Sequence, residues 1–141
     1  MAIPAKCVLL IDDENVPADF YAKALQRAGF SVRRARSVAE ALESLQSNKF
    51  VAIVLDIMMP PGKEYQDFDH AEGLRTGVFL LQDIKRLHPK TPIVVLTNVT
   101  NQETVNSLRC HSPEPVIAAK IDYPPLEFAS LVWTAIGERN E

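Results

Sequence analysis

The chain lacks the features that mark membrane-spanning, secreted and nucleic-acid-binding proteins. No apolar run approaches the roughly 20 residues that a transmembrane helix needs. No basic region followed by an apolar stretch and a cleavage site is visible at the amino terminus, so we expect a cytoplasmic protein without a signal peptide. The net charge is -3, with 15 basic and 18 acidic residues, which argues against binding to nucleic acid.

Cysteine is scarce, and the sequence has no organic-cofactor motif that we recognise. The two cysteines, Cys7 and Cys110, do not form a CxxC or other metal-binding spacing, so we expect two reduced thiols. The densest basic cluster is Arg33, Arg34 and Arg36. It falls on a short polar strand, which we interpret as a solvated sheet edge rather than a contact to a phosphate backbone.

Apolar and amphipathic segments alternate five times along the chain. The strands are expected at Cys7–Ile11, Ser31–Ala35, Val51–Asp56, Ile93–Thr97 and Val116–Lys120. The first, third and fourth are continuously apolar, as in parallel strands that are covered on both faces. We expect the second to lie at an edge because it is short and polar.

Each strand is followed by a segment with helical spacing of its apolar residues. These segments are Tyr21–Ala28, Val38–Leu45, Leu80–Leu87, a weaker stretch at Asn101–Cys110, and Phe128–Ile136. Gly29 follows the first, a Ser37–Glu40 capping box precedes the second, and Pro124-Pro125 precede the last. Five strand–helix units predict an α/β fold, a doubly wound parallel sheet with five helices. A length of 141 residues fits one domain, 1–141, with one long polar stretch at about 61–76.

Charged side chains follow three of the predicted buried strands. Asp12 and Asp13 follow the first, Asp56 ends the third and Lys120 ends the fifth, while Thr97 brings a hydroxyl to the end of the fourth. In a parallel sheet the carboxyl ends of the strands meet at one edge, where ligands bind. We therefore expect one site with three carboxylates and one ammonium group.

Such a set of groups suits a divalent cation and a phosphoryl group. Neighbouring carboxylates repel unless a cation lies between them, and Mg²⁺ prefers oxygen ligands. We expect Asp13 to bind Mg²⁺ directly, Asp12 to bind it directly or through water, and the Met58 backbone carbonyl to add a ligand. Asp56 would also contact the metal and would attack phosphorus as the nucleophile. Lys120 and Thr97 would hold the transferred group.

Taken singly, each of these residues has a more ordinary interpretation. An aspartate after a strand is usually a helix cap, a lysine at a strand end is usually solvated, and a threonine there is usually a strand residue. Their joint occurrence, in this order on five strand–helix units, favours the functional interpretation.

The sequence resembles the response-regulator receiver domains of two-component signal transduction, which are CheY-like proteins. The resemblance covers nearly the whole chain and rests on LLIDDE (Leu9–Glu14), VLDIMMP (Val54–Pro60), VVLTN (Val94–Asn98) and AAK (Ala118–Lys120). It implies a flavodoxin-like fold with strand order 2-1-3-4-5. It also implies Mg²⁺-dependent phosphoryl transfer from a phosphohistidine donor to Asp56, with Thr97 closing on the phosphoryl group.

The chain departs from the family pattern in ways that make it an atypical variant. The stretch at 61–76 is an insertion of roughly a dozen residues relative to the family. Ile117 stands where the family usually has an aromatic residue that moves together with the hydroxyl residue. The sequence therefore does not predict that Thr97 is coupled to an aromatic side chain. Lys120 is followed by Ile121, where the family usually has proline.

The resemblance implies a phosphoprotein of a phosphorelay that signals by protein–protein contacts and does not turn over external substrates. Its partners would be a sensor histidine kinase or phosphotransfer protein and a downstream protein or output domain, and the chain would be a monomer or weak dimer. One alternative is a pseudo-receiver, an interaction domain that is never phosphorylated. Another is a phosphatase with an aspartyl-phosphate intermediate, which the apolar Met58 disfavours because such enzymes usually have a second acid there.

Overall fold

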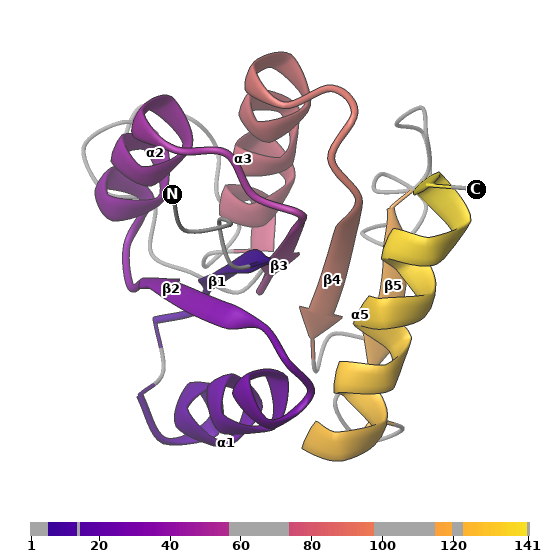
Figure 1. Cartoon of the computed structure of the whole chain (residues 1–141). Coiled ribbons are helices and arrows are strands. Elements are labelled where there is room, and N and C mark those ends of the chain that lie inside the picture. The colour runs from indigo at the N-terminus through magenta and orange to yellow at the C-terminus, as the bar shows by residue number, and fades with distance from the viewer. Residues whose placement is uncertain (1–5, 14, 57–73, 98–114, 120–122, 141) are drawn as a thin grey trace.

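The fold is a five-stranded parallel sheet with helices on both faces. The computed structural model describes residues 6–13, 15–56, 74–97, 115–119 and 123–140 (Figure 1). Its strands are β1 (Cys7–Ile11), β2 (Ser31–Ala35), β3 (Ala52–Leu55), β4 (Ile93–Thr97) and β5 (Val116–Ala119). The helices of the described residues are α1 (Asn15–Arg27), α2 (Val38–Ser47), α3 (Leu74–Leu87) and α5 (Pro125–Asn140). The strands run in the order β2-β1-β3-β4-β5, and every neighbouring pair is parallel.

These elements confirm the predicted fold class and the strand order that the resemblance implied. Strand β3 is shorter than predicted, since Val51 and Asp56 flank it instead of belonging to it. Strand β5 ends at Ala119, and Lys120 lies outside the described residues. The predicted helix at 101–110 and most of the stretch at 61–76 also lie outside them, while 74–76 form the start of α3.

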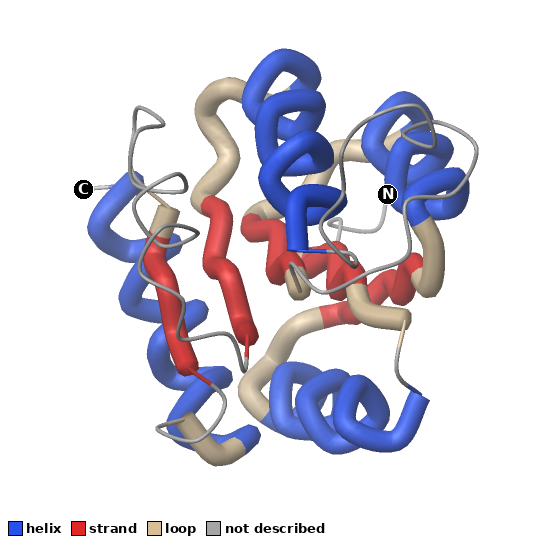
Figure 2. The backbone as a smooth tube through the Cα atoms, turned by 180° about the vertical axis from the view of Figure 1, so that it is seen from behind, coloured by secondary structure: helices blue, strands red, loops and turns tan. Residues whose placement is uncertain are grey.

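The sheet separates two hydrophobic cores. Side chains alternate along β1, so Val8 and Leu10 pack with α1 and α5, while Leu9 and Ile11 pack with α2 and α3. Figures 1 and 2 show these two helix pairs on opposite sides of the sheet. Because the central strands are covered on both faces, they read as continuous apolar runs, and β1 and β3 are almost fully buried.

The helix ends follow the signals in the sequence. The Ser37 hydroxyl accepts a hydrogen bond from the Glu40 N–H at 3.1 Å, which confirms a side-chain cap on α2. The Glu40 carboxylate in turn accepts from the Arg36 N–H at 3.2 Å, one residue earlier than in the standard capping box. Helix α5 begins at Pro125, where the missing N–H costs nothing.

An aromatic cluster holds α5 against the turn that ends α1. The Trp133 indole N–H donates to the Ala28 carbonyl at 2.8 Å, and the Trp133 ring stacks on Phe30 at 4.3 Å between centroids. The Lys6 ammonium lies 4.8 Å from the centre of the Trp133 ring. These contacts hold the end of α1 and the start of β2 against α5.

Strand β2 lies at the edge of the sheet, as its polar sequence predicted. Its arginines are more than solvated side chains. The Arg33 guanidinium donates to the Ser44 hydroxyl on α2 at 3.1 Å, and Arg34 forms an ion pair with Asp19 on α1. Successive side chains of a strand point to opposite faces, so the two arginines contact helices on opposite sides of the sheet.

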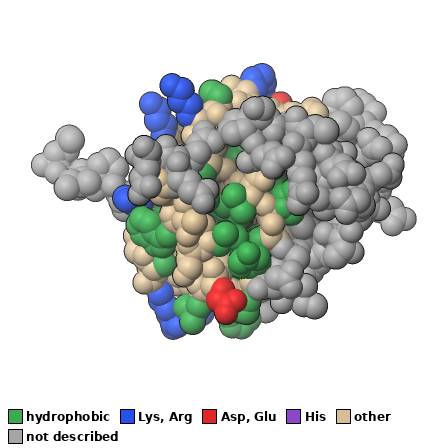
Figure 3. Space-filling view, turned by 90° about the vertical axis from the view of Figure 1, so that its right-hand side faces the viewer, with side chains coloured by type: hydrophobic (Ala, Val, Ile, Leu, Met, Phe, Trp, Pro, Cys, Tyr) green, Lys and Arg blue, Asp and Glu red, His purple; other side chains and the backbone are tan. Residues whose placement is uncertain are grey.

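The side of the molecule formed by α5 shows hydrophobic side chains among other side chains and backbone atoms (Figure 3). Among the described residues, the large hydrophobic side chains that are exposed are Phe20 on α1 (60%) and Leu126 on α5 (67%). Among the residues that the structure describes, no helix has the length and the apolar character of a membrane-spanning segment.

Gly29 ends α1 with a positive φ of 107°, and the Phe30 N–H donates back across it to the Leu25 carbonyl at 3.1 Å. We predict that Gly29→Ala lowers the free energy of unfolding by about 1–2 kcal/mol, because L-residues are strained in this conformation. A new Cβ would meet only Trp133, at an ordinary 3.6 Å, so the backbone is the cause.

Gly137→Ala is the matched control, since Gly137 is helical and a Cβ there would meet nothing within 4 Å. This change should stabilise the protein by roughly 0.5–1 kcal/mol. Urea denaturation of the three proteins measures both effects, and equal stabilities for the two variants would contradict the role of Gly29.

Candidate functional site

Two neighbouring strands bring acidic residues to the same edge of the sheet. Asp12 and Asp13 follow β1, and Asp56 follows β3. The two strands pair so that Ile11 lies opposite Leu55, and the Asp56 N–H donates to the Ile11 carbonyl at 2.9 Å. On the other side of β1, the Asp12 N–H donates to the Ala35 carbonyl at 3.0 Å. The sheet hydrogen bonds therefore continue into the acidic residues and fix their backbone.

The three side chains converge. Asp12, Asp13 and Asp56 each contribute a carboxylate oxygen to a set in which all atoms lie within 4.8 Å of one another. Asp12 and Asp56 are only 2% and 3% exposed, while Asp13 is more accessible. The structure thus brings together the three carboxylates that the sequence predicted would meet.

Such proximity is electrostatically unfavourable unless a cation is present. Two unit charges 4.8 Å apart repel by about 3.5 kcal/mol at an effective dielectric constant of about 20. The burial of Asp12 and Asp56 reduces the screening by water. Packing of the core does not require three carboxylates in one place. We therefore interpret the acidic cluster as a cation site.

The donor set fits a hard divalent cation. All three ligand groups are carboxylates, which Mg²⁺ prefers over nitrogen or sulfur ligands. Asp13 is more accessible than the other two residues, and Mg²⁺ usually keeps several waters among its ligands. Asp12, Asp13 and Asp56 are therefore the described residues that could hold this metal.

The other predicted site residues are only partly described. Thr97 is the last residue of β4 and lies at the same edge of the sheet. It comes two residues after Val95, which pairs with Leu55 of β3. Lys120 follows directly after β5, and both Lys120 and Met58 lie outside the described residues. Their assigned roles stay predictions.

Ile117, at the position of the expected switch aromatic, lies within β5 and pairs with Val95. Its side chain is half-buried and packs against the core on the α2–α3 side of the sheet. An isoleucine in this place extends the hydrophobic core toward the edge that carries Thr97.

Cys7 is not part of this site. It opens β1, at the opposite end of the strand from Asp12, and its thiol is free. Partial burial raises the pKa of the Cys7 thiol, and the backbone and charge of Arg33 oppose this shift. The thiol therefore stays protonated at neutral pH, and the second cysteine, Cys110, lies outside the described residues.

The fold is that of a doubly wound α/β protein with an acidic cluster at the carboxyl edge of its sheet. The model of the response regulator receiver domain family matches residues 8–112. This match spans more than half of the chain. The chain therefore belongs to the response regulator receiver domain family, as the sequence motifs predicted.

The relatives of the chain include regulatory proteins. The nitrogen assimilation regulatory protein NtrX of Azorhizobium caulinodans is 33% identical over 98 residues, which cover 69% of this chain and 19% of that protein. The response regulator protein PilR of Pseudomonas aeruginosa is 29% identical over 132 residues, or 94% of this chain and 26% of that protein. The chain thus spans only about a fifth to a quarter of the length of these two relatives.

Solved structures confirm the fold. The CheY-like receiver domain protein of Methanospirillum hungatei JF-1 matches with a TM-score of 0.79 at 19% identity, covering 97% of this chain and 98% of that chain. The DrrB receiver domain in a BeF3-activated form matches with a TM-score of 0.73 at 19% identity, covering 95% and 99%.

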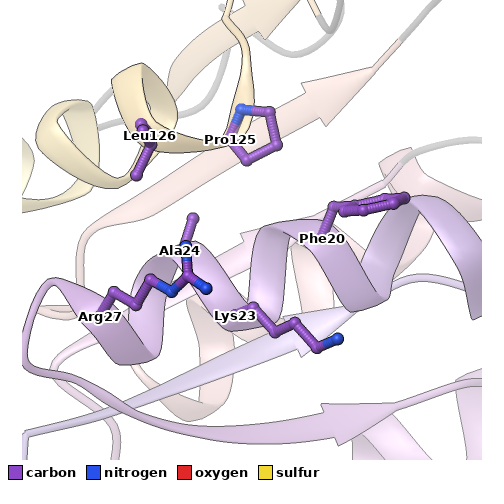
Figure 4. A pocket seen from close by; sticks show the side chains of 6 residues that line it. All are labelled: Phe20, Lys23, Ala24, Arg27, Pro125 and Leu126. Carbon is purple, nitrogen blue, oxygen red and sulfur yellow. The ribbon is translucent and has the colours of Figure 1, made fainter.

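Two further features of the structure were not predicted from the sequence. One is a groove between α1 and the first turn of α5, which is lined by Phe20, Lys23, Ala24 and Arg27 of α1 and by Pro125 and Leu126 of α5 (Figure 4). The other is a hydrogen bond from the Tyr21 hydroxyl to the Tyr123 carbonyl at 3.0 Å. The helical spacing identified Tyr21 only as an apolar position, because a backbone acceptor 102 residues away leaves no pattern in the sequence.

Replacing one carboxylate should stabilise the metal-free protein and weaken its response to metal. We predict that Asp13→Asn raises the free energy of unfolding without Mg²⁺ by about 1–2 kcal/mol, because it removes like-charge repulsion. Mg²⁺ at 100 times its dissociation constant should add about 2.7 kcal/mol to the natural protein and much less to the variant.

Denaturation in Mg²⁺ and in a metal chelator measures both quantities. Asp83→Asn is the control, because Asp83 forms a surface ion pair with Arg86 at 3.3 Å and should change stability by less than about 1 kcal/mol with or without Mg²⁺. An Asp13→Asn protein that is less stable than the natural one and keeps the full Mg²⁺ response would contradict the cation site.

Proposed function

We propose that this chain is a phosphoacceptor module that takes a phosphoryl group onto Asp56 in the presence of Mg²⁺ and signals by protein–protein contacts. One observation carries the proposal. The carboxylate of Asp56 lies within 4.8 Å of those of Asp12 and Asp13, in a chain that belongs to the receiver domain family. A structural role would not need three clustered acids at the end of buried strands.

The proposed reaction is a nucleophilic displacement at phosphorus. A carboxylate oxygen of Asp56 forms the new O–P bond while the N–P bond of a donor phosphohistidine breaks. The imidazole leaves and, as a neutral ring, keeps or takes up one proton. In the transition state, negative charge is spread over the three equatorial oxygens of the phosphoryl group.

The residues around Asp56 would supply the compensating charge. Asp12 and Asp13, with the backbone carbonyl of Met58, would hold Mg²⁺, which supplies electrostatic stabilisation of the phosphoryl oxygens when bound. The Lys120 ammonium would donate to one phosphoryl oxygen and the Thr97 hydroxyl to another. Thr97 ends the strand beside β3, which supports this assignment.

The partners follow from the same chemistry. The donor would be a sensor histidine kinase or a phosphotransfer protein, and the acceptor of the signal would be a downstream protein or an output domain. The relatives NtrX and PilR are response regulators several times longer than this chain, which supports a role in two-component signalling. We propose a single cytoplasmic receiver domain that does not turn over external substrates.

A pseudo-receiver that is never phosphorylated is the second candidate. The half-buried Ile117 in place of the usual aromatic favours it, because the usual switch coupling cannot operate unchanged. The gathered carboxylates favour phosphorylation instead. The two candidates differ in whether Asp56 forms a covalent or coordinate adduct.

We predict that acetyl phosphate with Mg²⁺ adds one phosphoryl group to the protein, and that Asp56→Asn abolishes the addition. Beryllofluoride, which is present in the activated DrrB receiver domain, should bind only when Asp56 is present. Asp19→Asn is the control, because Asp19 lies on α1 in an exposed ion pair with Arg34. Intact-protein mass spectrometry measures the addition.

Each alternative gives a different result in the same assay. Absence of any adduct on the natural protein would support the pseudo-receiver. Release of phosphate over many turnovers would support a hydrolase. An adduct that persists in Asp56→Asn would mean that another residue is the acceptor.

A further inference from the structure

The surface groove between α1 and α5 is separate from the acidic cluster. Its volume is about 290 Å³, and its lining comes from α1 and from the first turn of α5 (Figure 4). The short side chain of Ala24 leaves room between the longer side chains of Phe20 and Arg27 on one wall, and Pro125 and Leu126 form the other. None of these residues has a role in the proposed phosphoryl transfer.

The groove gathers apolar surface that the fold leaves exposed. Phe20 is 60% exposed and Leu126 is 67% exposed, and among the described residues these are the large hydrophobic side chains that remain exposed. They belong to helices far apart in the sequence, yet both line this groove. Single exposed hydrophobic residues are common on protein surfaces, but two of them in one groove favour a contact surface.

Two basic side chains line the same groove. Lys23 and Arg27 are one turn apart on α1, and both are exposed. Among the described residues, no carboxylate forms an ion pair with either of them, whereas Arg34 and Arg86 each have an acidic partner. Like charges at this spacing on a helix repel each other. A carboxylate that approached this wall of the groove would therefore be attracted by two cations.

The acidic residue beside the groove in the sequence has a local explanation. Glu127 follows Leu126 and lies in the first turn of α5, where a negative charge stabilises the positive end of the helix dipole. It does not line the groove. The charged side chains that line the groove are therefore all basic.

We propose that this groove binds an acidic amphipathic helix of a partner protein. Apolar side chains of that helix cover Phe20 and Leu126, and its carboxylates face Lys23 and Arg27. From Phe20 to Arg27, α1 rises by about 10.5 Å, or two helical turns, which matches a partner helix with apolar residues at i, i+3 or i+4, and i+7. A contact of this size binds weakly and reversibly.

A helix fits the groove better than a lipid surface does. The groove is concave and offers two large exposed apolar side chains, whereas a helix that lies on a membrane uses a much larger apolar face. The proposal does not rest on phosphoryl transfer to Asp56, because the groove and the acidic cluster share no residue.

A peptide library shows which helices the groove binds. The probe is a phage-displayed library of amphipathic helices of about 20 residues, in which the positions beside an apolar stripe carry Glu, Lys or Gln at random. Selection uses the full chain, and counter-selection uses Phe20→Ser/Leu126→Ser, whose fold is checked by urea denaturation. We expect acidic helices to be selected, and fluorescence anisotropy should show that they bind the double variant at least about ten-fold more weakly.

Charge reversal tests the electrostatic part of the proposal. Lys23→Glu should weaken binding of a selected acidic helix roughly five- to ten-fold, and replacing glutamates of that helix by lysine should restore binding to this variant. Lys49→Glu is the matched control, because Lys49 is exposed beside α2 and α3 on the other side of the sheet. It should leave the affinity unchanged.

Several results would overturn the proposal. These are a library without binders, selected helices that are basic or uncharged, and helices that bind the double variant equally well. Self-association of the chain that Leu126→Ser abolishes would assign the groove to a second copy. Binding to phosphatidylserine vesicles that the double variant loses would assign it to a membrane surface. Asp56→Asn should leave helix binding unchanged, so a failure of the proposed phosphoryl transfer is detected separately.

Discussion

The parallel pairing of β1 with β3 is the constraint on which the site depends. Ile11 lies opposite Leu55, and the Asp56 N–H closes the pairing on the Ile11 carbonyl. This register places Asp12 and Asp56 at the same height on adjacent strands, so their carboxylates meet. A shift of one residue would turn Asp56 to the other face of the sheet and disperse the cluster. Hydrophobic burial on both faces of β1 and β3 prevents this shift, because it would exchange the two cores.

The same packing holds the three acidic side chains in an arrangement that a bound cation would stabilise. Buried apolar residues before each aspartate hold the acidic side chains where they repel one another. In this account the protein is stable without metal but gains stability when a cation binds. Stored repulsion of this kind is common at functional sites, where local stability is given up for binding or reactivity.

Much of this arrangement could be predicted from the sequence, and the rest could not, for physical reasons. The continuous apolar runs predicted the bounds of β1 and β4 correctly, and Ser37 predicted where α2 begins. Periodicity and capping depend on only a few neighbouring residues, so they can be recognised in the sequence. The meeting of Asp12, Asp13 and Asp56 followed from the topology of parallel sheets. The partners of Arg33 and Tyr21 could not be predicted, because they depend on which distant atoms the packed helices bring within reach. The exact ends of β3 were not predicted, since pairing at strand ends depends on the neighbouring strand.

We propose that the fixed cluster of acids holds Mg²⁺ and makes Asp56 a phosphoryl acceptor. A crystal structure of the protein with Mg²⁺ and beryllofluoride tests it most directly. The account predicts a beryllium adduct on the Asp56 carboxylate, a metal ion bound by oxygens of Asp13 and Asp56, and the Lys120 ammonium against a fluoride. A structure grown under these conditions with Asp56 turned away from Asp13, and with neither ligand at the carboxyl edge of β1 and β3, would contradict it.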